Sequence, residues 1–172
     1  DAIVHLVAIP RDWNNGADLL RINTAGTEAM IAAASAAGIT RFVHLGALGV
    51  QDREELHYAK SKARAERAVR ESSLDWTIIK PSLIWGERDG FFNIVAALVK
   101  IPAPAVPVPG NGKSRFQPVW VGDVARAIVQ ALGDPKSARR SFELGGPRYW
   151  TYTEITQEVA RALGKRRIVV PM

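Results

Sequence analysis

The sequence predicts an α/β fold with a parallel sheet of the doubly wound type, followed by a smaller C-terminal lobe. Apolar strand-like runs alternate with amphipathic helical stretches through the first half of the chain, which indicates βαβ units with right-handed crossovers. The composition, 172 residues of which 47% are hydrophobic and 23% charged, is that of a globular protein with one main core. Such sheets bind ligands at the carboxyl ends of their strands, so we expect a site there.

The first predicted strand covers residues 2–8, Ala-Ile-Val-His-Leu-Val-Ala, an uninterrupted apolar run typical of a strand buried on both faces. The chain begins at Asp1, directly before this strand. We therefore expect that an N-terminal portion of the fold precedes it and that the exposed edge of the strand is covered by a partner chain or segment. Apolar residues then recur at helical spacing from Leu19 to Ala37, and Gly38 ends the predicted helix.

The second and third predicted strands cover residues 41–45 and 76–80. Between them, residues 57–72 form a predicted amphipathic helix whose Ala and Val residues face the core, while its Lys and Arg residues point outward. Pro81 ends the third strand, and residues 82–86 continue it as an extended segment. The ends of the three strands should therefore meet at one edge of the sheet, at Val7-Ala8, Gly46-Ala47 and Pro81-Ser82.

The C-terminal half predicts shorter elements. Residues 90–99 are a predicted helix, whereas four prolines make residues 101–110 too proline-rich for a regular central element and indicate a rigid surface segment. Asp123 is a candidate N-cap of a helix over 124–132, and we interpret it as a cap rather than as a catalytic acid. The other predicted elements are extended runs at 116–121, 141–144 and 167–170, and a helix capped by Thr151 or Thr153 that ends near Leu163.

Charge and composition narrow the function. The 23 basic and 17 acidic residues give a net charge of +6, but the basic residues are scattered and not interleaved with aromatic residues, so no nucleic acid partner is predicted. We interpret them as solvated faces; the alternative is attraction for an anionic ligand such as a dinucleotide phosphate. The chain has no cysteine, which excludes disulfides and thiolate nucleophiles and suits a reducing cytoplasm, the location we expect. No apolar run reaches the length of a membrane span.

Tyr58 and Lys62 form the most informative pair in the chain. On the predicted helix their i,i+4 spacing places both side chains on one face, within reach of a common ligand. An ammonium one turn away favours the phenolate, so the pair can act as a general acid or base nearer neutrality than a free phenol, whose pKa is about 10. The same pair also occurs by chance on solvated helix faces, so the catalytic interpretation depends on the rest of the chain.

An ordered set of motifs resembles extended and atypical short-chain dehydrogenases/reductases, often called NAD-dependent epimerase/dehydratase. The stretches at 76–82, Trp-Thr-Ile-Ile-Lys-Pro-Ser, and 112–119, Gly-Lys-Ser-Arg-Phe-Gln-Pro-Val, look most like the branch related to the dehydrogenase-like accessory subunit of respiratory complex I. The resemblance spans nearly the whole chain. It implies a partial Rossmann-like dinucleotide-binding domain over 1–86 and a small substrate-binding lobe over 87–172, interleaved with the last sheet elements. The other motifs that carry it are Asp1–Val7, Asn23–Thr27, Gly38–His44, Tyr58-x-x-x-Lys62, Gly86 and Gln117–Asp123.

The resemblance implies NAD or NADP as cofactor and a small-molecule substrate, with no metal. Tyr58 would be the catalytic acid or base, and Lys62 would hydrogen-bond the nicotinamide ribose while lowering the pKa of Tyr58. Asn23 would be structural or part of a proton path, unless it is simply an exposed helix residue. The other implied cofactor contacts are Leu6, Val7, Ala8, Pro81, Ser82 and Leu83. The implied substrate contacts are Phe91, Asn93, Arg115, Phe116 and Gln117, although core packing would explain Phe91 and Phe92 as well.

Two features depart from the family pattern. The family orients the substrate carbonyl with a Ser or Thr at the end of the strand before the Tyr helix, and this chain has Gly46-Ala47 there. One oriented donor to a developing oxyanion is worth about 2.7–4 kcal/mol, so its loss would slow carbonyl reduction about a hundredfold or more. Ser61 is a poor substitute, because it should point toward the helix side. The Gly-rich phosphate-binding turn does not occur in the sequence either, so tight cofactor binding would need it to be supplied upstream.

Two functions therefore stay open. In the first, the protein is an NAD(P)-dependent oxidoreductase or epimerase/dehydratase that uses Tyr58 and Lys62. In the second, it is a non-catalytic, structural or regulatory module that keeps Lys62 for binding NAD(P)H. Both functions involve binding of a dinucleotide, and they differ in whether Tyr58 still transfers a proton. Pairing through the edge strand at 2–8 would make the protein a homo-oligomer.

Overall fold

The structure, a computed structural model, describes all 172 residues of the chain. The chain forms two compact units. The first consists of residues 1–81 and 124–144, and the second of residues 82–123 and 145–172. The chain thus leaves the first unit after Pro81, returns to it for residues 124–144, and leaves it again.

A four-stranded parallel sheet is the centre of the first unit. Its strands are β1 (Ala2–His5), β2 (Arg41–Leu45), β3 (Asp75–Pro81) and β8 (Arg140–Leu144), in the order β1-β2-β3-β8. The register pairs His5 with His44 and Leu45 with Ile79, so the three strands that precede the candidate site end close to one another. This parallel sheet confirms the predicted fold class.

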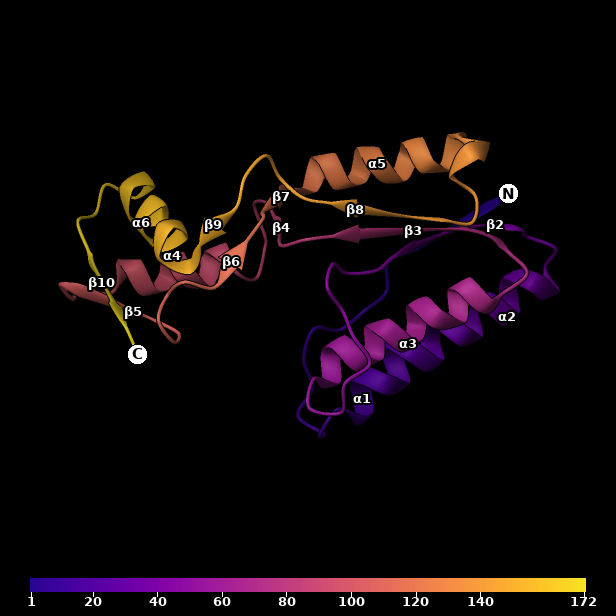
Figure 1. Cartoon of the computed structure of the whole chain (residues 1–172), viewed down its shortest axis with the longest axis horizontal. Coiled ribbons are helices and arrows are strands. Elements are labelled where there is room, and N and C mark those ends of the chain that lie inside the picture. The colour runs from indigo at the N-terminus through magenta and orange to yellow at the C-terminus, as the bar shows by residue number, and fades with distance from the viewer. The chain divides into compact units, whose positions relative to one another are not determined.

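Helices cover both faces of this sheet (Figure 1). On one face lie α1 (Ala17–Leu19), the π-helical η1 (Leu20–Ala25), α2 (Gly26–Ala36) and α3 (His57–Glu71). On the other lies α5 (Val121–Gly133), and the 3₁₀ turn η2 (Pro135–Ser137) leads from it into β8. The core between α2, α3 and the sheet contains Ala34, Phe42, Val69, Leu74, Trp76 and Ile78.

The first strand is shorter and less buried than predicted. The expected strand over 2–8 that is buried on both faces is wrong: β1 ends at His5, and its residues alternate between exposed and covered. The reason is its place at the end of the sheet, where it pairs with β2 alone. His5 is buried while Val4 is 37% exposed, so β1 presents one covered face and one open face.

The predicted helix from Leu19 to Ala37 is divided by a π-helical segment. η1 inserts one wider turn between α1 and α2, and it carries Asn23. Such wide turns change which side chains face inward, because they break the 3.6-residue period. Asn23 is 1% exposed and is hydrogen-bonded to Ile9 and to Ser61 of α3, so the interpretation of Asn23 as an exposed helix residue is wrong.

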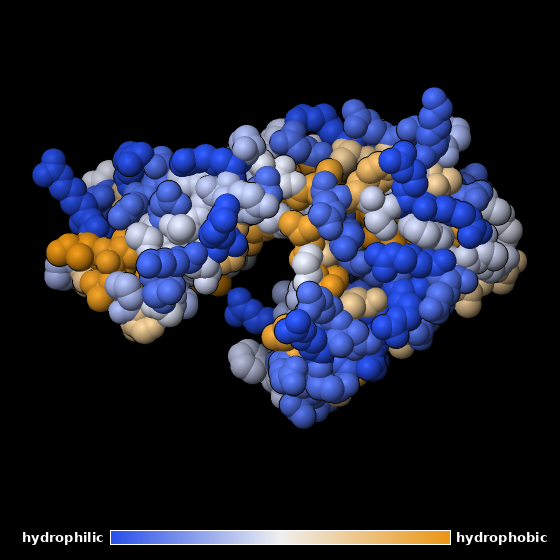
Figure 2. All heavy atoms as spheres, in the orientation of Figure 1, coloured by the Kyte–Doolittle hydropathy of each residue, from blue (hydrophilic) through white to orange (hydrophobic).

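Short strands and two helices build the second unit. α4 (Phe92–Lys100) and α6 (Tyr152–Ala162) share a small core that contains Val95, Val99, Val106 and Ala160. Three two-stranded sheets surround it: β5 (Ala105–Val108) with β10 (Ile168–Pro171), β4 (Ile84–Trp85) with β7 (Val119–Trp120), and β6 (Arg115–Phe116) with β9 (Trp150–Thr151). Figure 2 shows hydrophobic residues gathered at the β5–β10 end of this unit, where Ile101, Ile168, Val170 and Met172 are exposed.

One expectation for the second half needs correction, and two agree with the structure. The proline-rich segment contains no central strand: its strand β5 lies in a two-stranded sheet, and Pro107 is exposed there, at an edge that does not need its missing N–H. Asp123 is not the N-cap of α5, because the helix begins two residues earlier; Asp123 lies in the first turn, where the helix dipole favours a carboxylate. Thr151 does cap α6, in a reciprocal capping box with Glu154.

None of the helices combines the length and the hydropathy that a membrane crossing requires.

Candidate functional site

Lys62 is the buried cation of the candidate site. It lies on α3, the helix that follows β2, and is only 3% exposed. Its Nζ donates a hydrogen bond to the backbone oxygen of Leu45, the last residue of β2, at 2.6 Å. Burial lowers the pKa of Lys62 to about 8, and the negative charge of Glu66 acts against this shift. The amino group is therefore held at the carboxyl end of the second strand.

Tyr58 lies one turn before Lys62, in the first turn of α3, and is 37% exposed. Its hydroxyl makes no hydrogen bond within the chain. Burial raises the pKa of Tyr58, opposite to the lowering expected from a neighbouring ammonium, and that expectation is wrong for this structure. The physical reason is that Lys62 directs its Nζ to the Leu45 carbonyl instead. Tyr58 is a protonated, accessible phenol at neutral pH.

Leu6, Val7 and Ala8 follow β1 as an exposed apolar segment. The register of β1 and β2 ends at His5 and His44, and Leu6 follows His5 just as Leu45, whose oxygen accepts from Lys62, follows His44. The segment is tied down at its far end by Asn23. The side-chain oxygen of Asn23 accepts from the Ile9 backbone N–H at 2.8 Å, and its Nδ2 donates to the Ile9 oxygen at 3.0 Å and to Ser61 Oγ at 3.0 Å.

The strand end where the resemblance implies a hydroxyl residue reads Gly46-Ala47, and a side chain at Gly46 would meet Glu66. The Gly46 N–H donates to the Ile79 oxygen at 2.8 Å, which ties the end of β2 to β3. A Cβ on Gly46 would lie 2.5 Å from Glu66 Oε1 and 3.1 Å from Ile78 Cγ2. Ser61 does not replace the hydroxyl, because its Oγ donates to the Tyr58 backbone oxygen at 2.8 Å and accepts from Asn23. The end of β2 thus offers no side-chain donor at position 46.

Two histidines of neighbouring strands lie beneath this edge. His5 and His44 are stacked with their ring centroids 5.4 Å apart, and both are buried. His5 Nε2 is 3.0 Å from Thr27 Oγ1, whereas neither ring nitrogen of His44 has a partner. Burial holds the pKa of His44 well below its ordinary value, and the positive charge of Lys62 acts in the same direction. Both rings are therefore neutral at pH 7.

The remaining predicted cofactor contacts follow β3. Pro81 is buried at the end of the strand, and its oxygen accepts from the Leu48 N–H at 2.9 Å. Ser82 and Leu83 are half-buried and continue the chain into the second unit, where the Leu83 oxygen accepts from Val119 N–H at 2.9 Å. Pro81 thus helps to hold the loop that follows Gly46.

Most of the predicted substrate contacts already have partners within the second unit. The Phe91 ring packs against Phe116 and Tyr152, each at 5.4 Å between centroids, which fits the alternative that Phe91 belongs to the core. Asn93 donates to the Asp89 backbone oxygen at 2.9 Å and to that of Glu87 at 3.3 Å. Arg115 lies over the ring of Tyr149 at 4.4 Å, and Gln117 donates to the Gly146 oxygen at 2.7 Å.

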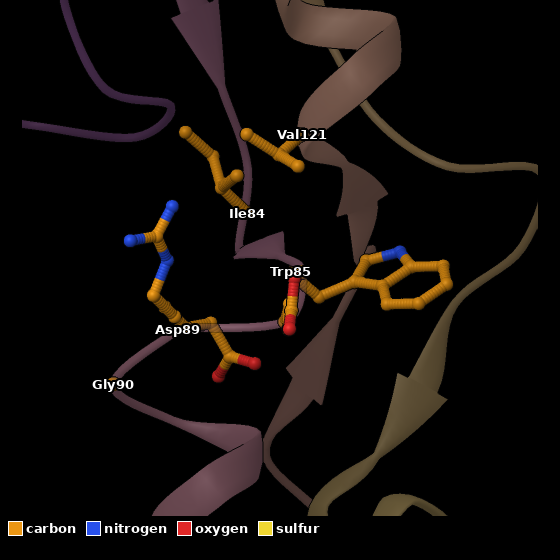
Figure 3. A pocket seen from close by; sticks show the side chains of 8 residues that line it. Ile84, Trp85, Asp89, Gly90 and Val121 are labelled. Atoms are coloured by element: carbon orange, nitrogen blue, oxygen red, sulfur yellow. The ribbon is translucent and has the colours of Figure 1, made fainter.

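The second unit contains a cavity of about 450 Å³ at the turn before α4. None of the five predicted substrate residues lines it, although Asn93 holds the turn that does. Figure 3 shows Ile84 and Val121 on one side of this cavity and Asp89 and Gly90 along the turn on the other. The Asp89 carboxylate is occupied in the turn before α4, since its Oδ1 accepts from the Phe91 N–H at 2.9 Å and from the Phe92 N–H at 2.5 Å.

Sequence reasoning missed Glu66 and the two stacked histidines. The prediction for α3 turned every Lys and Arg outward and counted Ala and Val as the covered face, whereas the buried residues include Lys60, Lys62 and Glu66. The signal was present in the spacing, because Lys62, Glu66 and Val69 recur at i, i+4 and i+7 on one face. Charged residues are so seldom buried that a pattern based on hydropathy alone passes over them.

These features define a dinucleotide-binding fold of the Rossmann type: a parallel sheet, ligand-facing strand ends and a lysine-bearing helix after the second strand. The chain belongs to the NAD(P)H-binding family, which its sequence matches over residues 1–135.

Similarity extends to respiratory-chain subunits and to epimerases. The chain is 31% identical over 147 residues to the mitochondrial NADH-ubiquinone oxidoreductase 40 kDa subunit of Neurospora crassa, covering 85% of this chain and 38% of that protein. It is 36% identical over 121 residues to the mitochondrial NADH dehydrogenase [ubiquinone] 1 alpha subcomplex subunit 9 of Arabidopsis thaliana, covering 70% and 30%. Among solved structures, the UDP-glucuronic acid 4-epimerase of Bacillus cereus in complex with NAD superposes with a TM-score of 0.86 at 18% identity, covering 100% of this chain and 63% of that chain.

The chain therefore spans 30 to 38% of the length of these two curated relatives. The epimerase shares the fold with this chain, and at 18% sequence identity the similarity concerns the fold alone.

Proposed function

We propose that the first unit binds the nicotinamide and ribose end of NAD or NADP, with Lys62 as the hydrogen-bonding cation. The observation that carries this proposal is the placement of a buried amino group at the carboxyl end of β2. An ammonium has three N–H donors, and only one is used by the Leu45 oxygen, so the others are available to ribose hydroxyls. Membership of the NAD(P)H-binding family supports the same ligand.

The neighbouring residues fit the chemistry of this ligand. Leu6, Val7 and Ala8 are exposed and apolar, and they follow β1 directly after His5, which pairs with His44, the residue before Lys62's carbonyl partner Leu45. An apolar, backbone-rich segment of this kind suits the flat face of a nicotinamide ring. The dinucleotide would supply hydride chemistry, and the chain's own residues would orient it. We further propose that substrate contacts belong to the second unit, from Phe91, Asn93, Arg115, Phe116 and Gln117.

Catalysis by Tyr58 is the second candidate function, in an oxidoreductase or an epimerase/dehydratase. It is supported by the accessible hydroxyl of Tyr58, which no group of the chain engages, and by a pKa raised by burial, which keeps the phenol a proton donor. Against a high rate stands Gly46-Ala47, where a donor to the carbonyl oxygen would be expected and where a side chain at Gly46 would meet Glu66. Dinucleotide binding without turnover is therefore the function that the geometry supports best.

The two functions separate in one set of measurements. Binding of NADH and NADPH is followed by fluorescence for the wild type, Lys62→Met, Tyr58→Phe and Lys60→Met. Lys60 is the matched control, because it lies on the same helix but pairs with Glu54. We expect Lys62→Met to weaken binding about tenfold or more, as for loss of a hydrogen bond to a charged group. Tyr58→Phe and Lys60→Met should stay within about twofold.

Turnover decides the second candidate. Oxidation of NADH or NADPH with a panel of carbonyl and quinone substrates should be abolished by Tyr58→Phe if Tyr58 donates the proton. Tight binding with no turnover in the wild type would establish the non-catalytic module. If a wild type that carries a Gly-rich phosphate-binding turn ahead of residue 1 binds neither dinucleotide, the proposal as a whole is refuted.

We also propose a cytoplasmic location and association of copies through β1. The first is supported by the absence of cysteine, which suits a reducing compartment. The second is supported by the unpaired edge of β1 in the sheet. Cell fractionation tests the location. Sedimentation of the wild type and of Val4→Lys tests the association, because a charge on the edge strand should dissociate such a pair.

A further inference from the structure

Glu66 is a buried carboxylate one turn after Lys62 on α3. The residue is 2% exposed, the least exposed acidic residue of the site, and it points to the carboxyl ends of β2 and β3. A buried carboxylate is costly unless its oxygens are paired. Its presence at this place therefore calls for an account of what each oxygen contacts.

Both oxygens of Glu66 are engaged, and the partners come from different elements. Oε1 accepts from the Ala47 N–H, just after β2, at 3.3 Å. Oε2 accepts from an Arg70 guanidinium nitrogen at 2.8 Å and lies 3.7 Å from Lys80 Nζ of β3. The single side chain thus links α3, the end of β2 and the middle of the sheet.

Glu66 lies one helical turn from Lys62 on the buried side of α3, while its carboxylate forms ion pairs with Arg70 and Lys80. Glu66 is the group whose charge raises the pKa of Lys62 against the effect of burial. The other titratable groups near this pair do not replace it. Tyr58 and Arg70 lie on α3, His44 on β2 and His5 on β1, and Lys80 on β3, where Lys80 also lies 3.9 Å from Glu143 of β8.

Steric packing gives Glu66 a second consequence. Its Oε1 would be 2.5 Å from a Cβ at position 46, so any residue larger than glycine must displace the carboxylate. Carboxylate and strand end are in contact through the Ala47 N–H as well. A hydroxyl residue at position 46 would therefore fit only if the buried Glu66 carboxylate moved away.

We propose that Glu66 is the positioning residue of the dinucleotide site: it fixes the end of β2 against α3, places a negative charge one helical turn from the Lys62 ammonium, and must shift if position 46 carries a side chain. This inference rests on the proposed function for the identity of the ligand. The assignment of Glu66 itself concerns only groups of the chain, and it can be tested without a ligand.

The first test follows the ionisation of Lys62 directly. The protein is labelled with lysine carrying ¹³C at Cε and titrated by NMR from pH 6 to pH 11, and the Lys62 signal is assigned by its loss in Lys62→Met. The wild type should titrate near pH 8, Glu66→Gln at a lower pH, and Glu71→Gln, a matched exposed acid on the same helix, as the wild type does. An unchanged midpoint in Glu66→Gln would overturn the assignment.

A second test covers the case in which Glu66→Gln does not fold. Thermal unfolding is compared for Gly46→Ser in the wild type and in Glu66→Ala. Gly46→Ser should lower the melting temperature of the wild type and have less than half that effect in the Glu66→Ala background, because the clash has been removed. Equal losses in both backgrounds would show that Glu66 does not determine the residue at position 46.

NADH binding then connects the residue to the ligand. At pH 8, Glu66→Gln should weaken binding about fivefold if its Lys62 midpoint falls by one pH unit, since the charged fraction falls in that proportion. Equal affinities of Glu66→Gln and the wild type at pH 8, despite a lower midpoint, would refute the link to the ligand. Absence of NADH binding by a wild type that carries a Gly-rich phosphate-binding turn would instead refute the proposed function, and the two ligand-free tests would still decide the role of Glu66.

Discussion

Asn23 hydrogen-bonds both backbone groups of Ile9, with its Oδ1 on the N–H at 2.8 Å and its Nδ2 on the oxygen at 3.0 Å. An amide side chain that pairs with a backbone N–H and C=O in this way replaces the two hydrogen bonds that a neighbouring strand would make. It fixes the segment that carries Leu6, Val7 and Ala8, although that segment lies beyond the end of β1. Asn23 lies in the π-helical turn η1, and this wider turn sets the direction of its side chain.

Asn23→Ala should therefore weaken both the fold and the ligand site. Loss of the three hydrogen bonds of Asn23 should reduce the free energy of unfolding by about 2–3 kcal/mol, because polar groups of Ile9 and Ser61 lose their partner. Urea denaturation measures this change, with Asn14→Ala, at an exposed position, as the control. A loss as small as that of the control would show that the Ile9 segment is held by other contacts.

Lys62→Met should change how stability depends on pH. The folded-state pKa of Lys62 is lowered to about 8 from 10.5, so the unfolded chain binds this proton more readily than the folded one. Wild-type stability is therefore reduced as pH falls through this interval, and the reduction is complete below about pH 8. The Met variant should gain about 2–3 kcal/mol relative to the wild type between pH 10 and pH 7.

Chemical denaturation at several pH values between 7 and 10 checks this gain. Lys100→Met, which removes an exposed lysine, should keep the wild-type dependence on pH. Parallel curves for Lys62→Met and the wild type would mean that Lys62 is not desolvated in solution.

His44→Leu should reduce the sensitivity of the protein to acid. The pKa of His44 is held well below its ordinary value of 6.5 by burial. Below about pH 6.5, His44 is therefore protonated in the unfolded state but stays neutral in the folded state. Stability is then lost as pH falls, by at most about 1.4 kcal/mol per pH unit for this one group. Leucine removes the effect, and near neutrality it should cost little, because neither ring nitrogen of His44 has a partner to lose.

Thermal unfolding between pH 5 and pH 7 measures the slope. His57→Gln, at an exposed histidine, is the control, and part of the slope should persist in His44→Leu because burial also lowers the pKa of His5. A slope that is identical in His44→Leu and the wild type would contradict the buried, neutral state of His44.

Gly146→Ala should destabilise the second unit strongly. A Cβ at Gly146 would fall on the backbone oxygen of Pro118, which cannot move as a flexible side chain could. The free energy of unfolding should fall by about 2 kcal/mol or more, as for overpacked sites. Gly90→Ala is the control, because nothing lies within 4 Å of its added Cβ. Equal melting temperatures for the two variants would contradict the close approach of Gly146 to Pro118.

Local signals in the sequence predicted the elements that depend on local physics. β2 was predicted with its observed bounds, Arg41–Leu45, because a buried parallel strand reads as a short apolar run. Thr151 with Glu154 three residues later gives a capping box that short-range geometry alone requires. Asp123 failed as a cap because helix ends are set within one or two residues by tertiary contacts.

The sequence was sufficient to predict Lys62 as a site residue, but not to predict which groups surround it. The spacing of Tyr58 and Lys62 marks the helix face, but the direction of Nζ depends on which backbone oxygen is close, here that of Leu45. Glu66 lies in the same stripe, yet its burial follows from partners on β2 and β3 that are distant in sequence. Hydrophobic periodicity has no means of showing such pairs.

The second unit is not a continuous stretch of the chain. The two connections into it leave from Pro81 and Leu144, which are directly paired in the register of β3 and β8. A recombination event that exchanged this unit for another would therefore need to replace residues 82–123 and 145–172 together while leaving residues 124–144 in place. Changes in this unit should then arise by substitution, position by position, rather than by transfer of one continuous segment.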